Sequence, residues 1–251
     1  MQADTAFRSS GRSALQSVRM QMEKTIICIG GGELRTKETK SIDSYIAQKA
    51  FLLAEGRRPY ALFVPTASHD SMPYNNSFHR MYTGEFKLKT DVALTVYGEM
   101  DYEHIAEKFS KADVIYVGGG DTLYMLQQWE KTGITRLLSE AYNRGAILCG
   151  LSAGAICWFE RMYTDSALSG SEGAYHLCRG LGWLEGTVSP HYNLRIAGFD
   201  EILKREDGCA YAIEDNAAIE FTNGRFARAI SSGGAAYRIC SQNGILKKEM
   251  L

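Results

Sequence analysis

The sequence predicts an α/β fold in which a mostly parallel sheet carries helices on both faces, giving three layers. Short apolar runs alternate with helical stretches from Lys24 onward. Strands buried on both faces of a parallel sheet read as continuous apolar runs of this kind. Glycine-rich turns follow several of the runs, at the strand ends where such sheets bind ligands. We therefore expect a single domain over residues 22–251.

The individual elements follow from these patterns in chain order. The expected sheet strands are 25–29, 60–64, 92–96, 114–117 and 146–149. Apolar positions at helical spacing predict helices over 41–55, 75–86, 102–109, 122–129, 134–143 and 195–205. Short strands are expected at the C-terminal end, over 210–213, 217–221, 226–230 and 236–239. The dipeptide Asn223-Gly224 predicts a hairpin turn between two of them.

Composition excludes several classes of partner. The chain has 251 residues, 45% hydrophobic and 23% charged, with a formal net charge of −1. Nucleic acid and anionic membranes require a basic face, so neither is expected as a partner. The longest apolar runs are too short to span a bilayer. We expect a monomer or a homodimer.

The six cysteines form no C-x-x-C pair and no zinc-ligand spacing with histidine. Cys28, Cys149 and Cys240 lie in apolar, strand-like runs, where a free thiol behaves as a small hydrophobic group. We therefore expect a cytoplasmic protein without structural disulfides, metal or organic cofactor.

Residues 1–21 differ from the rest of the chain. They are rich in Ser, Gln and Arg and have no apolar period. An Arg/Ser-rich transit peptide has such a composition, but a disordered leader, an artificial extension or an early start codon is the simpler interpretation. The domain is then expected to begin near Met20 or Met22.

The segment Gly150-Leu151-Ser152-Ala153-Gly154 fits the pattern G-x-S-x-G. In a strained turn from strand to helix, small flanking residues let the backbone pass close by and expose the serine hydroxyl. An apolar run precedes the segment and a predicted helix follows it, so the context favours a nucleophile over a turn that only packs or holds phosphate. Ser152 is the predicted nucleophile.

The preceding strand ends in Gly118-Gly119-Gly120-Asp121-Thr122. Glycines there let backbone N–H groups face a ligand directly. We expect Gly119 or Gly120, together with Ala153, to form an oxyanion hole. No Walker lysine follows and no G-x-G-x-x-G pattern fits, so nucleotide binding is the poorer interpretation. The turn Gly30-Gly31-Gly32 resembles a dinucleotide-binding turn but lacks the spacing as well.

A nucleophilic serine needs a base and an acid that orients it. Among the five histidines, His191 follows an apolar stretch and Pro190, and it is modestly favoured over His69. For the acid, the residues alone leave four candidates open: Asp165, Asp200, Glu214 and Asp215.

Together, the Ser152 segment, the Gly118–Thr122 segment and Ser189-Pro190-His191-Tyr192 resemble the peptidase E family of serine peptidases. That family is similar to class I glutamine amidotransferases but has Ser where those have Cys. The resemblance extends from about Lys24 to the C-terminus. It implies a Ser-His-Glu triad made of Ser152, His191 and Glu214, with Asp165 as the second choice of acid.

The resemblance also implies a substrate. The best-known members are dipeptidases that prefer an N-terminal Asp, and Arg195 is the candidate to hold that carboxylate. The loop before Arg195 looks shorter than in those members, so the preference rests on a partial match. Two other functions stay open: a cyanophycinase-like peptidase for β-aspartyl polymers, and a non-catalytic sensor on the same fold. Residues 68–82 are a candidate substrate wall or lid.

Overall fold

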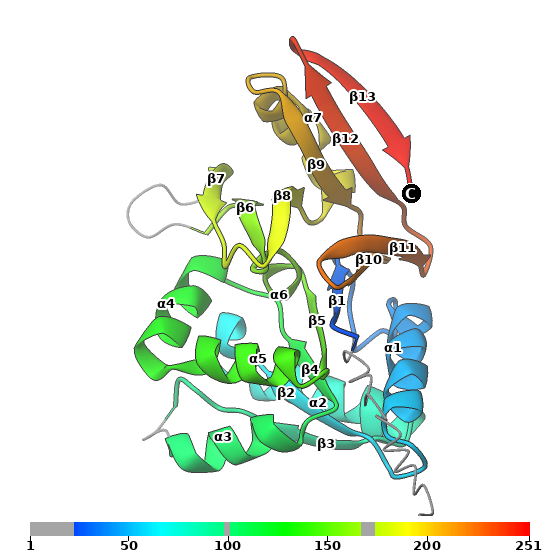
Figure 1. The fold of residues 1–251 in the computed structure, drawn as a ribbon, viewed down its shortest axis with the longest axis vertical. Helices are drawn as coiled ribbons and strands as arrows, with labels where there is room; N and C mark the ends of the chain where they lie inside the picture. Colours follow the sequence, from blue (N-terminus) through cyan, green and yellow to red (C-terminus); the bar gives the residue numbers. More distant parts are fainter. Residues whose placement is uncertain (1–22, 98–100, 167–173) are drawn as a thin grey trace, which may run out of the picture.

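In the computed structural model of the protein, which describes residues 23–97, 101–166 and 174–251, the predicted central sheet forms (Figure 1). Its strands are β1 (Thr25–Ile29), β2 (Tyr60–Val64), β3 (Lys89–Val92), β4 (Val114–Val117), β5 (Ile147–Leu151), β10 (Ala217–Thr222) and β11 (Arg225–Ser231). They lie in the order β11-β10-β1-β5-β4-β2-β3. In the part of the sheet ordered β1-β5-β4-β2-β3, all neighbouring strands are parallel. Strands β10 and β11 form an antiparallel hairpin, and β10 pairs antiparallel with β1.

Helices cover both faces of this sheet, as predicted. They are α1 (Lys40–Leu53), α2 (Met72–His79), α3 (Tyr102–Lys111), α4 (Thr122–Thr132) and α5 (Ile134–Asn143). Alternate residues of each strand enter two separate cores. One core joins the sheet to α3, α4 and α5, and the other joins it to α1, α2 and the π-helical turn Arg80–Glu85. This division explains why the fully buried strands β1, β2, β4 and β5 are apolar throughout.

A second sheet, which the sequence analysis did not predict, lies above the first in Figure 1. It contains β6 (Phe159–Thr164), β7 (His176–Arg179), β8 (Leu184–Ser189), β9 (Gly208–Ile213), β12 (Ala236–Gln242) and β13 (Ile245–Met250). The strands expected over 210–213 and 236–239 belong to this sheet. Helix α7 (Tyr192–Leu203) packs on it through a small core around Phe199. The chain enters this sheet after β5 and returns to the first sheet at β10.

Some predicted boundaries are wrong. The strand expected over 92–96 is β3, which lies earlier, at Lys89–Val92. The helix expected over 75–86 begins at Met72 and changes to the π-helical turn after His79. The hairpin at Asn223-Gly224 is confirmed, because it joins β10 to β11 and both residues have positive φ, 51° and 76°.

The expectation that no cysteine is oxidised is also wrong. Cys209 on β9 and Cys240 on β12 face each other across an antiparallel pair and form a disulfide, with the Cα atoms 4.0 Å apart. The residues are 31 positions apart in sequence, so only the pairing of their strands brings them together. The other four cysteines are free thiols.

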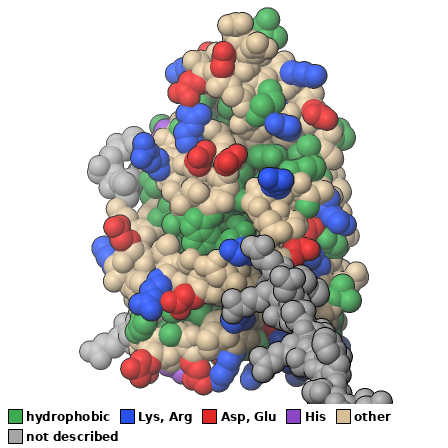
Figure 2. Space-filling view, viewed as in Figure 1, with side chains coloured by type: hydrophobic (Ala, Val, Ile, Leu, Met, Phe, Trp, Pro, Cys, Tyr) green, Lys and Arg blue, Asp and Glu red, His purple; other side chains and the backbone are tan. Residues whose placement is uncertain are grey.

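The surface seen in Figure 2 has lysine, arginine and acidic side chains interspersed, with apolar side chains grouped at mid-height between the two sheets. Within the described ranges, no helix has the length and apolar character needed to cross a membrane. The predicted leader, residues 1–21, lies outside the described part of the chain.

Candidate active site

Ser152 occupies a sharp turn between β5 and the short helix α6 (Ala153–Ile156). Its backbone has φ 51° and ψ −107°, a conformation that a residue with a side chain adopts only under strain. The flanking glycines make the turn possible. A Cβ at Gly150 would lie 2.3 Å from the carbonyl oxygen of Gly154, and one at Gly154 would lie 2.2 Å from that of Val117. The turn therefore has the predicted nucleophile-elbow geometry.

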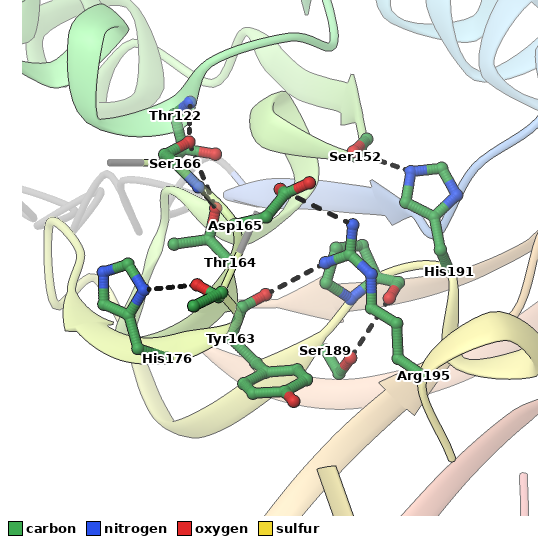
Figure 3. Close-up of polar contacts among 12 residues, drawn as sticks. Thr122, Ser152, Tyr163, Thr164, Asp165, Ser166, His176, Ser189, His191 and Arg195 are labelled. Atoms are coloured by element: carbon green, nitrogen blue, oxygen red, sulfur yellow. Dashed lines mark hydrogen bonds and ion pairs between the residues drawn. The ribbon is translucent and has the colours of Figure 1, made fainter. Parts of the chain in front are cut away.

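His191 lies beside Ser152, at the junction of β8 and α7 (Figure 3). Its Nε2 is 2.8 Å from the Ser152 Oγ. His191 also has positive φ, 48°, and its ring is partly buried, with 24% of the side chain exposed. His69, the alternative base, is exposed and packs against Tyr124, with ring centroids 4.1 Å apart. The structure thus brings His191, and not His69, to the serine.

The acid beside His191 is Asp215, which corrects the expectation for Glu214. Asp215 Oδ1 lies 2.5 Å from His191 Nδ1. The Glu214 carboxylate instead accepts hydrogen bonds from the Ala235 N–H at 3.0 Å and the Tyr237 hydroxyl at 3.4 Å. Strand β9 ends at Ile213, and consecutive side chains beyond it point to opposite sides. Glu214 therefore faces β12, whereas Asp215 faces the histidine.

Asn193 holds Asp215 in place with two hydrogen bonds. Its Nδ2 donates to Asp215 Oδ2, and its Oδ1 accepts from the Asp215 N–H, both at 3.0 Å. No pattern in the sequence predicted a role for Asn193. The available signal was its position two residues after His191, where the first turn of α7 carries both side chains toward the end of β9.

The carbonyls at the end of β1 connect the three segments that form the site. Ile29 accepts the Ser152 N–H at 2.9 Å, and Gly30 accepts the His191 N–H at 3.0 Å. Gly31 accepts the Asn216 N–H, also at 3.0 Å. Consecutive carbonyl groups of one short turn therefore fix the backbone beside the serine, the histidine and the acid.

Gly31 has no room for a side chain. A Cβ there would lie 1.9 Å from Asp215 Oδ1 and 2.3 Å from His191 Nδ1. The glycine turn that resembled a dinucleotide-binding loop thus allows the backbone to pass directly behind the His191–Asp215 pair.

The expected oxyanion donors are not equivalent. The Gly119 N–H already donates to the Tyr74 hydroxyl, at 3.2 Å. The N–H groups of Gly120 and Ala153 have no acceptor in the described part of the chain. Helix α6 has only four residues, so its dipole contributes little at this site.

A cleft of about 490 Å³ opens at the Ser152–His191 pair. Helix α2 and the residue before it form one wall, with Ser71, Tyr74 and Ser77 facing the cleft. Glu33 and Arg35, from the loop after β1, bring charges of both signs to it. The segment 68–82, expected as a wall or lid, supplies a wall.

Arg195 and Asp165 form a separate cluster (Figure 3). Arg195 Nη1 donates to the Tyr163 carbonyl at 3.2 Å, and Nη2 lies 3.9 Å from Asp165 Oδ1. The guanidinium also stacks on Tyr175, 4.5 Å from the ring centroid. Among the described residues, neither Arg195 nor Asp165 lines the cleft. Asp165 therefore lies beside Arg195 and not beside His191.

No group of three or more His, Cys, Asp or Glu side chains in a metal-binding arrangement occurs among residues 23–97, 101–166 and 174–251.

Known proteins resemble this chain over most of its length. The chain matches the model of peptidase family S51 over residues 26–229. It is 34% identical over 223 residues to the uncharacterized peptidase YgaJ of Bacillus subtilis (strain 168), an alignment that covers 86% of this chain and 92% of that protein.

Two solved structures have a similar fold. A peptidase from an acI-B1 Actinobacterium aligns with a TM-score of 0.66 at 19% identity, covering 92% of this chain and 97% of that one. A Listeria monocytogenes EGD-e protein described as a peptidase E aligns with a TM-score of 0.61 at 18% identity, covering 83% and 98%. The expected class I glutamine amidotransferase-like fold is confirmed. Since the family match spans most of the sequence and the aligned relative is itself a peptidase, the chain belongs to peptidase family S51 and is a serine peptidase.

Proposed function

We propose that the protein hydrolyses short peptides through a triad of Ser152, His191 and Asp215. The observation that carries this proposal is the unbroken chain of contacts from the Ser152 Oγ through both ring nitrogens of His191 to Asp215, at 2.8 and 2.5 Å. With Asp215 accepting the Nδ1 proton, the Nε2 lone pair is left to face the serine hydroxyl. Asp215 thereby sets the tautomer that a general base requires.

Each catalytic step then has an assigned group. His191 takes the proton from Ser152 as its oxygen attacks the scissile carbonyl carbon, and it returns that proton to the leaving amine. A water molecule, deprotonated by the same imidazole, then releases the acyl group from the serine. The N–H groups of Gly120 and Ala153 are available to hold the oxyanion. One such donor is worth about 3–4 kcal/mol of barrier in other hydrolases.

We also propose that the substrates include dipeptides with an N-terminal Asp. The support is Arg195, which lies on α7, four residues after His191, and outside the cleft lining. Its contact with Asp165 is long, 3.9 Å, while Asp165 itself is half exposed. A substrate carboxylate can replace so loose a partner and gain two parallel hydrogen bonds to the guanidinium. The volume of the cleft, about 490 Å³, is in the range that suits small ligands.

The test of the nucleophile is Ser152→Ala, with the exposed Ser110→Ala on α3 as the matched control. We expect Ser152→Ala to lose dipeptide hydrolysis and fluorophosphonate labelling while keeping its thermal unfolding midpoint, because the hydroxyl is the attacking group. The control should label and turn over like the wild type. A folded wild-type protein that never labels would instead support the sensor function.

The substrate proposal is tested with α-aspartyl, β-aspartyl and neutral dipeptides on the wild type and on Arg195→Met. Preference for α-Asp that disappears in the variant supports it. Preference for the β-linked peptides supports the cyanophycinase-like alternative, and equal rates on neutral peptides contradict both.

A further inference from the structure

We propose that Tyr74 is a catalytic residue whose hydroxyl donates a hydrogen bond to the oxyanion, in the place expected for the Gly119 N–H. The inference deepens the proposed peptidase function and rests on it. Its starting point is the hydrogen bond from the Gly119 N–H to the Tyr74 oxygen, 3.2 Å long. While that bond exists, Gly119 cannot donate to a substrate.

The Tyr74 hydroxyl is free to donate a hydrogen bond. Its oxygen accepts from Gly119, and within the described residues its own hydrogen has no acceptor. Burial raises the pKa of the phenol well above its ordinary value, so the group stays protonated at neutral pH. A hydroxyl that accepts one hydrogen bond becomes a stronger donor of another. The hydrogen bond from the Gly119 N–H thus makes the Tyr74 hydroxyl a stronger donor to the oxyanion.

The phenol is also close to the serine. Tyr74, Gly119 and Ser152 line the same cleft. A Cβ on Gly119 would lie 3.5 Å from the Ser152 Cβ, and one on Gly118 would lie 3.0 Å from the Tyr74 ring. The backbone of Gly118 and Gly119, at the end of β4, is therefore in contact with the Tyr74 ring on one side and with Ser152 on the other. A carbonyl carbon attacked by Ser152 places its oxygen in the cleft that the phenol lines.

Packing holds the ring in this position. It meets Phe63 edge to face, with centroids 5.0 Å apart and planes at 72°. Pro73 precedes it at the start of α2, where a proline suits the first helical turn. A donor fixed before the reaction needs no reorganisation as charge develops on the oxygen. No proton is transferred; the phenol shares its hydrogen with the oxyanion and keeps it.

The test is Tyr74→Phe, which keeps the ring and removes the donor. We expect kcat to fall roughly 100-fold, as for loss of one oxyanion donor elsewhere, with KM nearly unchanged. The affinity for a peptide aldehyde, whose serine adduct carries an oxyanion, should fall in parallel. The matched control is Tyr116→Phe. Tyr116 belongs to the same aromatic cluster, 6.0 Å from Phe63, and its hydroxyl has no partner among the described residues.

A second variant separates a donor from a structural role. Tyr74→p-aminophenylalanine restores an N–H donor at the same place and should recover part of kcat and of the aldehyde affinity. Unchanged or increased kcat in Tyr74→Phe, with its unfolding midpoint preserved, would overturn the inference, since the phenol would then only occupy the Gly119 N–H. Ser152→Ala measured alongside keeps the outcomes distinct: if that variant still hydrolyses the peptide, the proposed function itself has failed.

Discussion

Ser152, His191 and Asn216 all have positive φ, at 51°, 48° and 61°. For residues with side chains such conformations cost on the order of 1–3 kcal/mol each and persist only where surrounding contacts impose them. Here the N–H of each residue is bound to a carbonyl at the end of β1. The strain is therefore concentrated at the site and balanced by hydrogen bonds to a single buried strand.

The assignment of the acid can be tested by comparing two neighbouring carboxylates. We expect Asp215→Asn to lower kcat by about 10⁴-fold, because the amide leaves the imidazole in the wrong tautomer. Glu214→Gln should stay close to wild type, since Glu214 contacts Ala235 and Tyr237 rather than the histidine. Initial rates on one dipeptide, with circular dichroism to confirm folding, make the comparison. If Glu214→Gln lost most of its kcat while Asp215→Asn kept it, Glu214 would be the acid that orients His191.

The residues of the site differ in how far sequence could predict them. Ser152 follows from a local pattern, because the strand before it and the turn after it are encoded nearby. The residues alone favoured His191 only modestly over His69, because the strand before it, β8, has a mixed composition, and the family resemblance made the choice. Asp215 could not be separated from Glu214, because the choice depends on how the chain leaves β9. Asn193 and Tyr74 act through partners that lie 22 and 45 positions away, and no local spacing encodes such contacts.

At the scale of elements, strands buried on both faces were the easiest to predict. The boundaries of β1, β2 and β4 match because every residue in them is buried. Strand β3 lies at the edge and begins with Lys89, Thr90 and Asp91, so its pattern is polar. Strands β6 and β8 have the same burial sequence, with an exposed second residue and a buried end. Because their composition is mixed, the sequence pattern did not distinguish these two strands from loops.

The pairing of β9 with β12 leads to a prediction about thiols. Alkylation of the unfolded, unreduced protein should modify four cysteines, and prior reduction should raise this to six, because Cys209 and Cys240 are bonded. Reduction should also lower stability, by up to about 4 kcal/mol from the entropy of a loop of this length. Mass spectrometry gives the count, and urea unfolding with and without reductant gives the stability. Six modified cysteines without reductant would contradict the bond.

At the scale of the whole molecule, the site lies where the two sheets meet. Ser152 follows β5 of the first sheet, and His191 follows β8 of the second. Asp215 lies in the connection from β9 to β10, where the chain passes from one sheet to the other. The geometry of the proposed triad consequently depends on how the two sheets are docked.

Asp43 on α1 gives the molecule a pH-dependent stability. Burial raises its pKa to about 7, against hydrogen bonds from Thr39 and Tyr82 that lower it. The ordinary value is 3.8, so between pH 4 and 7 the folded state holds a proton that the unfolded state has lost. The contribution of Asp43 to the free energy of unfolding therefore falls as pH rises through this window and is constant above it. The full effect is at most about 4 kcal/mol.

Asp43→Asn removes this titration. We expect the variant to gain stability relative to the wild type as pH rises from 4.5 to 7.5, measured by urea unfolding at several pH values. Glu130→Gln, on the exposed side of α4, is the control and should parallel the wild type. A constant difference between Asp43→Asn and wild type across the range would show that the carboxyl does not titrate there.

The three carbonyls at the end of β1 also determine when the enzyme can become active. On the ribosome these carbonyls are synthesised well before the residues whose N–H groups they accept, which are residues 152, 191 and 216. A nascent chain that ends before residue 216 can place the serine, and then the histidine, but has no complete anchor for the acid. If the proposed triad is right, its three segments become available in the order nucleophile, base, acid, and the site can act only after residue 216 has been synthesised.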